Sequence, residues 1–513
     1  MFKFEGTLLM PVCVLALYAI ACSGDDRQES DVIEDGEVAN DIVDDGQTAD
    51  MPIDSTGGRP LEIGPHSGLP IAGEWFDDWD ARHSITSSRW IQSSDFGTST
   101  FEIIEFDKEN RSVVARNADS NQFSPGLFSR FDWTEKDGRV YYCNTRFDAA
   151  TAQEAAGEAP ADGADPENGG CVSFAWSRLN QVPSWDFLGV FKDEWGTSHT
   201  IRPDGWIQDF EGQESLFRII SVNAEKGYLV AENDGENQFS PGLFSRMDWV
   251  TFMDRLYFCH TRFDAPTAAD AEASPAPERK HPDQSGCQGF AWTALDPLAE
   301  PMAEIIDAPG DTGQGTGDAA KAVNGVRGGG RDAGGSDVFS VGFDLDANGY
   351  LVIGIKDRSI KDGPGSDFAI FENVFSLGDG GMFMDPAVVL LSRDGLTWVP
   401  YPFDYTADDE NAYSKRPSDW DGFAGVTPVM LNEETNDVNP FDQAAAGGDH
   451  FDLANLDPGD PEAAAIRKYG FRILKIIPAA IVLNPDTGEA FVRDPMSNGP
   501  DIDGVWARNL LAD

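Results

Sequence analysis

The ten residues NQFSPGLFSR at positions 121–130 occur a second time, without a change, at positions 237–246. The two copies are 116 residues apart (237 minus 121), and the same shift aligns glycines, tryptophans and cysteines on either side without a gap. Self-similarity at a fixed period indicates repeated structural units. The sequence therefore predicts two tandem domains, at residues 70–180 and 187–296.

Large and polar residues alternate through much of each repeat, as in SLFRIISVNAEKGYLVAEN at 215–233. This period of two predicts antiparallel strands joined by short turns. We therefore expect a mainly β protein, in which each repeat is a small antiparallel β-barrel or β-sandwich. Tryptophans within such strand patterns pack in the core more often than they bind sugar rings. The tryptophans in question are Trp90, Trp133, Trp206 and Trp249.

Within the repeated string, Ser-Pro-Gly has the composition of a type II turn. Proline fixes φ near −65° at the first central position, and glycine accepts the positive φ of the second. A structural turn is the first interpretation. In the alternative, exposed polar residues of the string bind a ligand. These are Asn121, Gln122 and Arg130, with Asn237, Gln238 and Arg246 in the second copy.

Four of the six cysteines obey the same shift, since Cys143 corresponds to Cys259 and Cys171 to Cys287. One pair per repeat in an exported protein predicts the disulfides Cys143–Cys171 and Cys259–Cys287. A zinc site would need four clustered soft ligands. The one histidine beside these cysteines, His260, has an asparagine as its counterpart in the first repeat.

The N-terminus has the pattern of a bacterial export signal: a lysine at position 3, an apolar run over 7–21 and small residues before Cys22. The run is too short for a permanent membrane-spanning helix. The stretch resembles a lipobox, which implies a lipoprotein signal peptide at 1–21 and lipid on Cys22. Ser23 then implies sorting to the outer membrane rather than the inner membrane. An ordinary cleaved signal peptide is the alternative.

Residues 22–69 are dense in aspartate and glutamate and predict an acidic disordered tether. The whole chain carries 89 acidic residues against 37 lysines and arginines, for a net charge of −52. Nucleic acid is therefore excluded as a partner, because phosphate binding needs a basic surface. We expect membrane contact through the lipid anchor instead.

Residues 297–318 are read as a linker rich in glycine and alanine, and residues 319–513 as a third domain. Its motifs, in order, are VNGVRGGG, IKDGPGSDFAIFENVF, DPAVVLLSRDGLTWVPYPFD, FAGVTPV, GGDHFDLANL and PDIDGVW. The series resembles a family of bacterial surface lipoproteins from spirochaetes and other Gram-negative bacteria. The tandem repeats are similar to modules of spirochaete and myxobacterial lipoproteins. The resemblance implies a discoidin-like or jelly-roll β-sandwich and a cell-surface location, with no assigned activity.

Acidic and amide side chains gather in three of these motifs, and calcium takes six to eight such oxygens, often from separate loops. The sequence predicts one calcium site here. The alternative is that the carboxylates only form turns and cap strands. The candidate ligands are Asp362, Asp367, Glu372, Asn373, Asp449, Asp452, Asp501 and Asp503.

Support for catalysis is weak, because the six histidines form no HExxH motif and no GxSxG motif is present. We therefore predict a non-enzymatic surface module that binds a glycan or another extracellular ligand, with calcium as its one candidate cofactor. A structural envelope spacer and an acidic glycoside-acting enzyme are the alternatives. An exposed aromatic groove would favour the binding module, and uniformly buried tryptophans would favour the spacer.

Overall fold

A computed structural model describes residues 61–63, 68–185, 187–253, 255–310, 317–343, 349–378, 380–409 and 411–512. The predicted signal peptide, Cys22 and most of the predicted tether lie outside these residues. The described part is mainly β, as expected, with two barrels followed by a domain of stacked strands.

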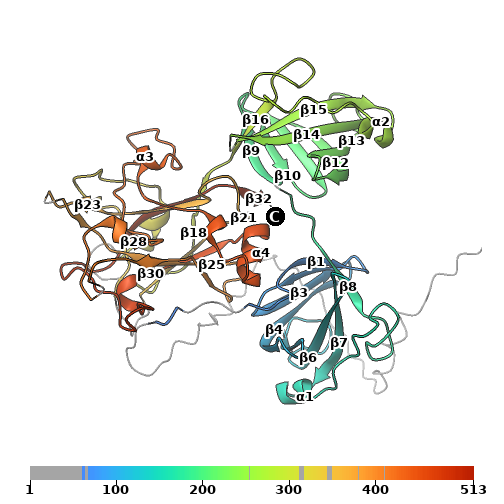
Figure 1. Cartoon of the computed structure of the whole chain (residues 1–513), viewed down its shortest axis with the longest axis horizontal. Helices are drawn as coiled ribbons and strands as arrows, with labels where there is room; N and C mark the ends of the chain where they lie inside the picture. The colour runs from blue at the N-terminus through green and yellow to red at the C-terminus, as the bar shows by residue number, and fades with distance from the viewer. Residues whose placement is uncertain are drawn as a thin grey trace, which may run out of the picture. The chain divides into compact units, whose positions relative to one another are not determined.

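The first repeat is a closed barrel of eight antiparallel strands in chain order, in which the first strand pairs with the last (Figure 1). Closure leaves no free sheet edge. The strands are β1 (Gly73–Asp77), β2 (Arg82–Ile85), β3 (Arg89–Ser94), β4 (Gly97–Asp107), β5 (Ser112–Asn117), β6 (Phe128–Lys136), β7 (Arg139–Ala149) and β8 (Ser177–Gln181).

The second repeat forms the same closed barrel, again antiparallel throughout. Figure 1 shows its strands in green. They are β9 (Gly189–Asp193), β10 (Ser198–Ile201), β11 (Gly205–Phe210), β12 (Gln213–Asn223), β13 (Tyr228–Asn233), β14 (Phe244–Phe252), β15 (Arg255–Ala265) and β16 (Thr293–Pro297).

Aromatic side chains fill each barrel. Trp90 is fully buried, and its ring stacks on Phe131 with 4.6 Å between the ring centroids. In the second barrel, Phe187 stacks on Trp249 at 4.9 Å. The prediction of core tryptophans is confirmed, since all four are buried. They are therefore not available to bind a ligand.

The repeated string forms the predicted turn. Leu127 N–H donates to the Ser124 carbonyl at 3.2 Å across Pro125 and Gly126, and Gly126 has φ of 71°. This positive φ at the second central position fits a type II turn and explains the glycine. The side chain of Phe123, just before this turn, is about half exposed.

Each barrel carries one disulfide, and both pairings are confirmed: Cys143–Cys171 and Cys259–Cys287. Each closes a loop that begins with a short helix, α1 (Ala152–Ala156) or α2 (Ala268–Glu272). Threonine side chains cap these helices, because their oxygens accept a backbone N–H of the first turn. The disulfides tie these loops to strands β7 and β15.

The third domain contains two five-stranded antiparallel sheets. The first consists of β17 (Glu300–Pro301), β31 (Asp501–Ala507), β22 (Phe368–Glu372), β29 (Asp449–Phe451) and β19 (Phe339–Ser340). The second consists of β18 (Glu304–Asp307), β20 (Leu351–Gly354), β30 (Ile473–Pro478), β25 (Ala387–Ser392) and β26 (Val399–Pro400). Buried residues of both sheets, including Phe368, Val505, Ile353 and Ile476, share one core.

Short elements surround the two sheets. Three strand pairs are β21 (Arg358–Ile360) with β32 (Leu510–Ala512), β23 (Phe375–Ser376) with β24 (Met382–Phe383), and β27 (Asp404–Tyr405) with β28 (Trp420–Asp421). The helices are α3 (Gln443–Ala446) and α4 (Pro461–Tyr469), with short 3-10 helices at Ala319–Val323, Pro417–Asp419, Leu453–Asn455 and Ala479–Ile481.

Two predicted boundaries need correction. The segment predicted as a linker, 297–318, contributes β17 and β18 to the two sheets, because its EP and EIID stretches pair with β31 and β20. The predicted tether is ordered at its end, where Leu61 forms a parallel bridge with Val482. Leu69 is fully buried in the core of the first barrel. Both segments contain a few apolar residues that pack in the fold. The average composition of each segment does not show them.

Candidate ligand groove and acidic centres

An open groove of about 430 Å³ lies at one end of the first barrel, where the turn between β1 and β2 meets the disulfide loop. Two large aromatic side chains in it are exposed: Trp79 is 70% exposed and Phe174 is 54% exposed. Tryptophan is usually buried, so exposure on this scale makes the groove a candidate contact site. The groove is lined by Asp78, Trp79, Tyr141, Glu167 and the segment 174–178.

The Trp79 turn is held from inside the barrel by Asp77, at the end of β1. One oxygen of Asp77 accepts the N–H groups of Trp79 and Ala81 at 2.9 and 3.0 Å. Its other oxygen lies 3.2 Å from His83 Nε2 and 3.0 Å from the Tyr142 hydroxyl. Burial alone would raise the pKa of Asp77, but the hydrogen bonds from His83 and the turn lower it. Asp77 is therefore a charged anchor for the turn.

His83 extends this network to the core tryptophan. Trp90 Nε1 donates to His83 Nδ1 at 3.0 Å, so the histidine carries its proton on Nε2 and donates it to Asp77. The chain Trp90–His83–Asp77 connects the centre of the barrel to the exposed turn. Each member has its hydrogen-bond partner, which makes the turn rigid.

The second barrel repeats this network at the shifted positions. Asp193 accepts the Trp195 N–H at 2.9 Å and lies 3.2 Å from His199 Nε2, and Trp206 donates to His199 Nδ1 at 3.2 Å. Burial lowers the pKa of His199, which favours its neutral form. Trp195 is 71% exposed, almost the same fraction as its counterpart in the first barrel.

The second groove aromatic, Phe174, lies on a four-residue turn at the disulfide. Cys171 and Phe174 exchange backbone hydrogen bonds of 3.0 and 2.8 Å. Between them, Val172 adopts φ of 54°, a conformation that is strained for a β-branched residue. Such strain is maintained where the surrounding structure fixes the backbone, often at functional sites. Gln288, the counterpart of Val172, has φ of 53°, so this turn has the same conformation in both barrels.

Polar groups flank the two aromatic side chains. The Tyr141 hydroxyl donates to Glu167 at 2.9 Å, and this hydrogen bond lowers the pKa of Glu167. Arg178 Nε donates to the Asn180 side chain at 2.6 Å, which fixes the arginine at the groove. The groove thus offers carboxylate acceptors and a guanidinium donor beside aromatic faces. This combination is typical of sites for small polar ligands.

The aromatic positions recur in the second barrel, whereas one polar position does not. Phe290, the counterpart of Phe174, is 76% exposed. Asp283 replaces Glu167, but Ala294 replaces Arg178. The 116-residue shift aligns Trp79 with Trp195, but neither was predicted as a site residue. Retention of a tryptophan in both copies, outside the alternating strand pattern, was the signal that could have found them.

The residues of the repeated string do not form a binding surface. Asn121, Arg130, Asn237 and Arg246 are buried, which corrects the expectation that they are exposed in the binding alternative. Arg130 pairs with Asp132 and donates to the carbonyls of Ala156 and Glu158, at the end of α1. The string is conserved between the repeats because the fold needs it. Gln122 and Gln238 are exposed.

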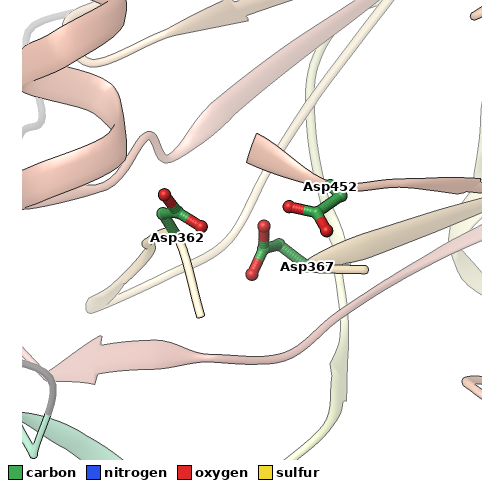
Figure 2. A group of neighbouring side chains, drawn as sticks. All are labelled: Asp362, Asp367 and Asp452. Atoms are coloured by element: carbon green, nitrogen blue, oxygen red, sulfur yellow. The ribbon is translucent and has the colours of Figure 1, made fainter. Parts of the chain in front are cut away.

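Three predicted calcium ligands come together in the third domain. Figure 2 shows the carboxylates of Asp362, Asp367 and Asp452 facing one another, and their ligand atoms lie within 4.8 Å of one another. Each already has protein partners. Asp362 pairs with Arg467 at 2.9 Å, Asp367 accepts N–H groups of Leu453 and Asn509, and Asp452 caps Ala454. Burial raises the pKa of Asp367 to about 8.

The other five predicted ligands lie outside this triad. Asp449 accepts the backbone N–H groups of Gly425 and Val426, and Asp503 accepts that of Arg327 with both oxygens. Glu372, Asn373 and Asp501 lie together in a second group. In it, Glu372 accepts the backbone N–H of Asp501 and the backbone N–H of Asn373 donates to the Asp501 carbonyl. The eight residues therefore do not form one set. The order of the motifs along the chain could not predict which of these residues lie close together in the fold.

No protein-family model matches the chain, and no curated protein matches it. Of the helices in the described ranges, none has both the length and the apolar character needed to cross a membrane.

Proposed function

We propose that this chain is a non-enzymatic surface lipoprotein whose barrels bind glycan through their aromatic grooves. One observation carries the proposal: an exposed tryptophan and an exposed phenylalanine line the groove, and the same pair recurs in the second barrel. Exposing such side chains costs free energy in water, so their retention in both copies favours a partner over a spacer role.

The groove matches the chemistry of a sugar ring. One face of a pyranose presents C–H groups, which pack on the electron-rich face of an aromatic ring, while its hydroxyls point outward. Trp79 and Phe174 offer the aromatic faces. Asp78 and Glu167 can accept hydrogen bonds from hydroxyls, and Arg178 can donate them. The groove volume of about 430 Å³ is within the usual range for small-ligand sites.

Charge narrows the class of glycan. The chain has a net charge of −52, and the groove itself contains two carboxylates against one arginine. Anionic polysaccharides would be repelled by this field. Neutral glycans, or glycans with amino groups, are therefore the favoured class.

The exposed Trp195 and Phe290 of the second barrel offer a second aromatic face, and two such faces in one chain allow binding to a repeating polymer. Once one groove is occupied, the second binds as an intramolecular step, which raises overall affinity by about 10²–10⁴ where the geometry allows both contacts. Glycans are repetitive and individual sugar contacts are weak. The duplication of the barrel thus supports a function in polysaccharide binding.

The location follows from the N-terminal sequence. The export pattern before Cys22 supports lipid attachment there, and the acidic segment after it supports a tether that carries the barrels away from the outer membrane. For the third domain we propose a discoidin-like or jelly-roll sandwich, supported by its two sheets with a shared core and by the motif series. This domain would act as a second surface module.

The test is binding of the full chain to immobilised neutral polysaccharides and to heparin as an anionic control. Replacing both groove tryptophans, Trp79→Ala and Trp195→Ala, should reduce retention on the neutral matrix at least tenfold. Phe96→Ala is the matched control, because Phe96 is 93% exposed and its counterpart is a glycine. If no neutral matrix retains the protein, or the control loses as much binding as the double variant, the glycan function is wrong and a spacer role is favoured.

A further inference from the structure

The end of β22 in the third domain places a carboxylate in the protein interior. Glu372, the last residue of this strand, is only 2% exposed. Its Oε1 accepts the backbone N–H of Asp501 at 2.9 Å. Its Oε2 is buried and has no hydrogen-bond partner in the described structure. A buried carboxylate oxygen without a partner is costly and therefore indicates a missing ligand.

Other carboxylates surround Glu372. Gly425 lies between the side chain of Glu372 and the backbone of Asp385: a Cβ built on Gly425 would be 3.4 Å from Glu372 Cγ and 2.4 Å from the backbone carbonyl oxygen of Asp385. The negative charges of Asp385, Asp501 and Asp449 all act on Glu372. Strand order explains the gathering, because Asp501 begins β31, the neighbour of β22, and Asp385 precedes β25.

A β-bulge marks the same place. Phe371 pairs with Gly504 and Glu372 pairs with Ile502, so β31 carries one extra residue between the two pairs. Bulges redirect side chains and are frequent beside functional sites. Here the bulge lies where Glu372 and Asp501 meet.

The group lacks compensating positive charge. In the described structure, Glu372, Asp385 and Asp501 form no ion pair with lysine or arginine. The Ser340 hydroxyl donates to Asp501, and the neutral side chains of Asn373 and Ser497 lower the pKa values of Asp501 and Asp385. The positive charge of Arg493 acts on Asp385. Several buried carboxylates with so little compensation would destabilise the fold if all were ionised.

The carboxyl groups around Glu372 can lose their charge to protons or to a cation. Burial and the charges of Asp385 and Asp501 raise the pKa of Glu372 well above its usual value, and burial raises that of Asp385 to about 7. No hydrogen-bond donor reaches Glu372 Oε2 in the described structure, so this oxygen is satisfied either by a proton that a neighbouring carboxylate accepts or by a cation. A bound cation would satisfy this oxygen and neutralise its neighbours.

We propose that Glu372, Asp385 and Asp501 bind one divalent cation, with Ca²⁺ as the ion that fits. The donors are all oxygens from separate segments, and calcium accepts irregular oxygen sites whereas magnesium requires a near-regular octahedron. Among the described residues, the ligand atoms of Glu372, Asp385 and Asp501 do not all lie within the 4.8 Å that joins Asp362, Asp367 and Asp452, so binding requires side chains of the three residues to turn toward one another. This site is independent of the proposed glycan function.

The test is calorimetric titration of CaCl₂ into the metal-free full chain, with MgCl₂ as a second titrant. The wild type should bind one Ca²⁺ at this site. Glu372→Gln, which keeps the shape and removes the charge, should weaken binding at least tenfold. Asp362→Asn is the matched control in the other acidic group and should bind Ca²⁺ like the wild type. Mg²⁺ should bind at least tenfold more weakly than Ca²⁺.

Thermal unfolding is the second measurement, because it shows whether each variant is folded and whether calcium stabilises it. In chelator, Glu372→Gln should melt no lower than the wild type, because it removes a buried charge. Calcium should raise the melting temperature of the wild type and leave that of the variant unchanged. Should the glutamine variant not fold, Asp385→Asn takes its place in both measurements. The proposal is overturned if the wild type binds no Ca²⁺ or if Glu372→Gln and Asp385→Asn both bind Ca²⁺ like the wild type. It is also overturned if Asp362→Asn alone loses Ca²⁺ binding.

Discussion

Trp79 and Trp195 occupy equivalent positions in the two barrels, and each is exposed above a buried Asp–His–Trp network. The network connects the backbone of each exposed tryptophan to a tryptophan at the barrel centre. A single exposed tryptophan on a loop without such hydrogen bonds would be weak support for a binding role. Two such tryptophans, on turns held by the same hydrogen bonds in both copies, support the proposed role of these side chains in binding.

Loss of the histidine should loosen the tryptophan turn. His83→Ala leaves Trp90 Nε1 without its acceptor and removes a donor from Asp77, which should lower the stability of the first barrel by about 2 kcal/mol. Hydrogen-exchange mass spectrometry would show faster exchange over residues 77–90. His199→Ala should affect only the second barrel. Unchanged exchange in both variants would contradict the supporting role of this network.

The two disulfides should each stabilise their own barrel. Replacing Cys143 and Cys171 by serine opens a loop with a sequence separation of 28. In the loop-entropy account this costs about 3–4 kcal/mol. Chemical denaturation should show an earlier transition, and the Cys259/Cys287 variant provides the matched comparison. Non-reducing peptide mapping that found free thiols or bonds between the repeats would disprove the pairing.

The grooves should differ in affinity, because Arg178 has Ala294 as its counterpart. Loss of the guanidinium hydrogen bond in Arg178→Ala should weaken binding to the first groove about tenfold, or about 1.4 kcal/mol. The measurement is calorimetry in a Trp195→Ala background, which isolates the first groove. The reverse change, Ala294→Arg, should strengthen the second groove in a Trp79→Ala background. If neither Arg178→Ala nor Ala294→Arg changes the affinity for the glycan, Arg178 does not contribute to binding.

Stability of the third domain in chelator should fall as pH rises. Burial raises the pKa of Asp367 to about 8 from its usual 3.8, and the negative charges of Asp362 and Asp452 also raise it. The positive charge of Arg508 interacts with the same carboxylate. Between about pH 4 and 8 the unfolded chain has released a proton that the folded state retains, so folding becomes less favourable with increasing pH.

Asp367→Asn mimics the protonated acid and should flatten this dependence in thermal unfolding between pH 4.5 and 8. Burial also raises the pKa of Asp385 and Asp503, each to about 7, so part of the slope should remain. An unchanged slope in the variant would show that Asp367 does not hold its proton.

Membrane attachment should depend on Cys22. In cells, Cys22→Ala should move the protein from the membrane fraction to the soluble fraction, and mass spectrometry of the wild type should find lipid on this residue. A variant that stays with the membrane after signal cleavage would contradict the lipid anchor.

Local pattern was sufficient to predict the repeats, their strands, their core tryptophans and both disulfides, because the shift and the alternation are properties of the chain itself. It failed where tertiary pairing decides the outcome. The segment EIID joins a sheet only because β20 lies beside it. Arg130 appeared to be a surface residue, yet the carbonyl end of α1 and Asp132 draw it into the interior.

The site was harder to predict for the same reason. Trp79 and Phe174 are separated by 95 residues (174 minus 79) and meet only when the barrel closes. The acidic residues of the third domain could be named from their motifs. Their division into a partnered triad and a group around Glu372 depends on strand order and on a bulge.

The most direct test of glycan binding is fluorine NMR of the full chain labelled with 5-fluorotryptophan. The chain has 13 tryptophans, and the resonances of Trp79 and Trp195 can be assigned from the variants that lack them. Titration with a neutral oligosaccharide that the immobilised-polysaccharide assay identifies should shift these two resonances and leave those of Trp90 and Trp206 in place. Binding that leaves both exposed tryptophans unshifted would contradict the account.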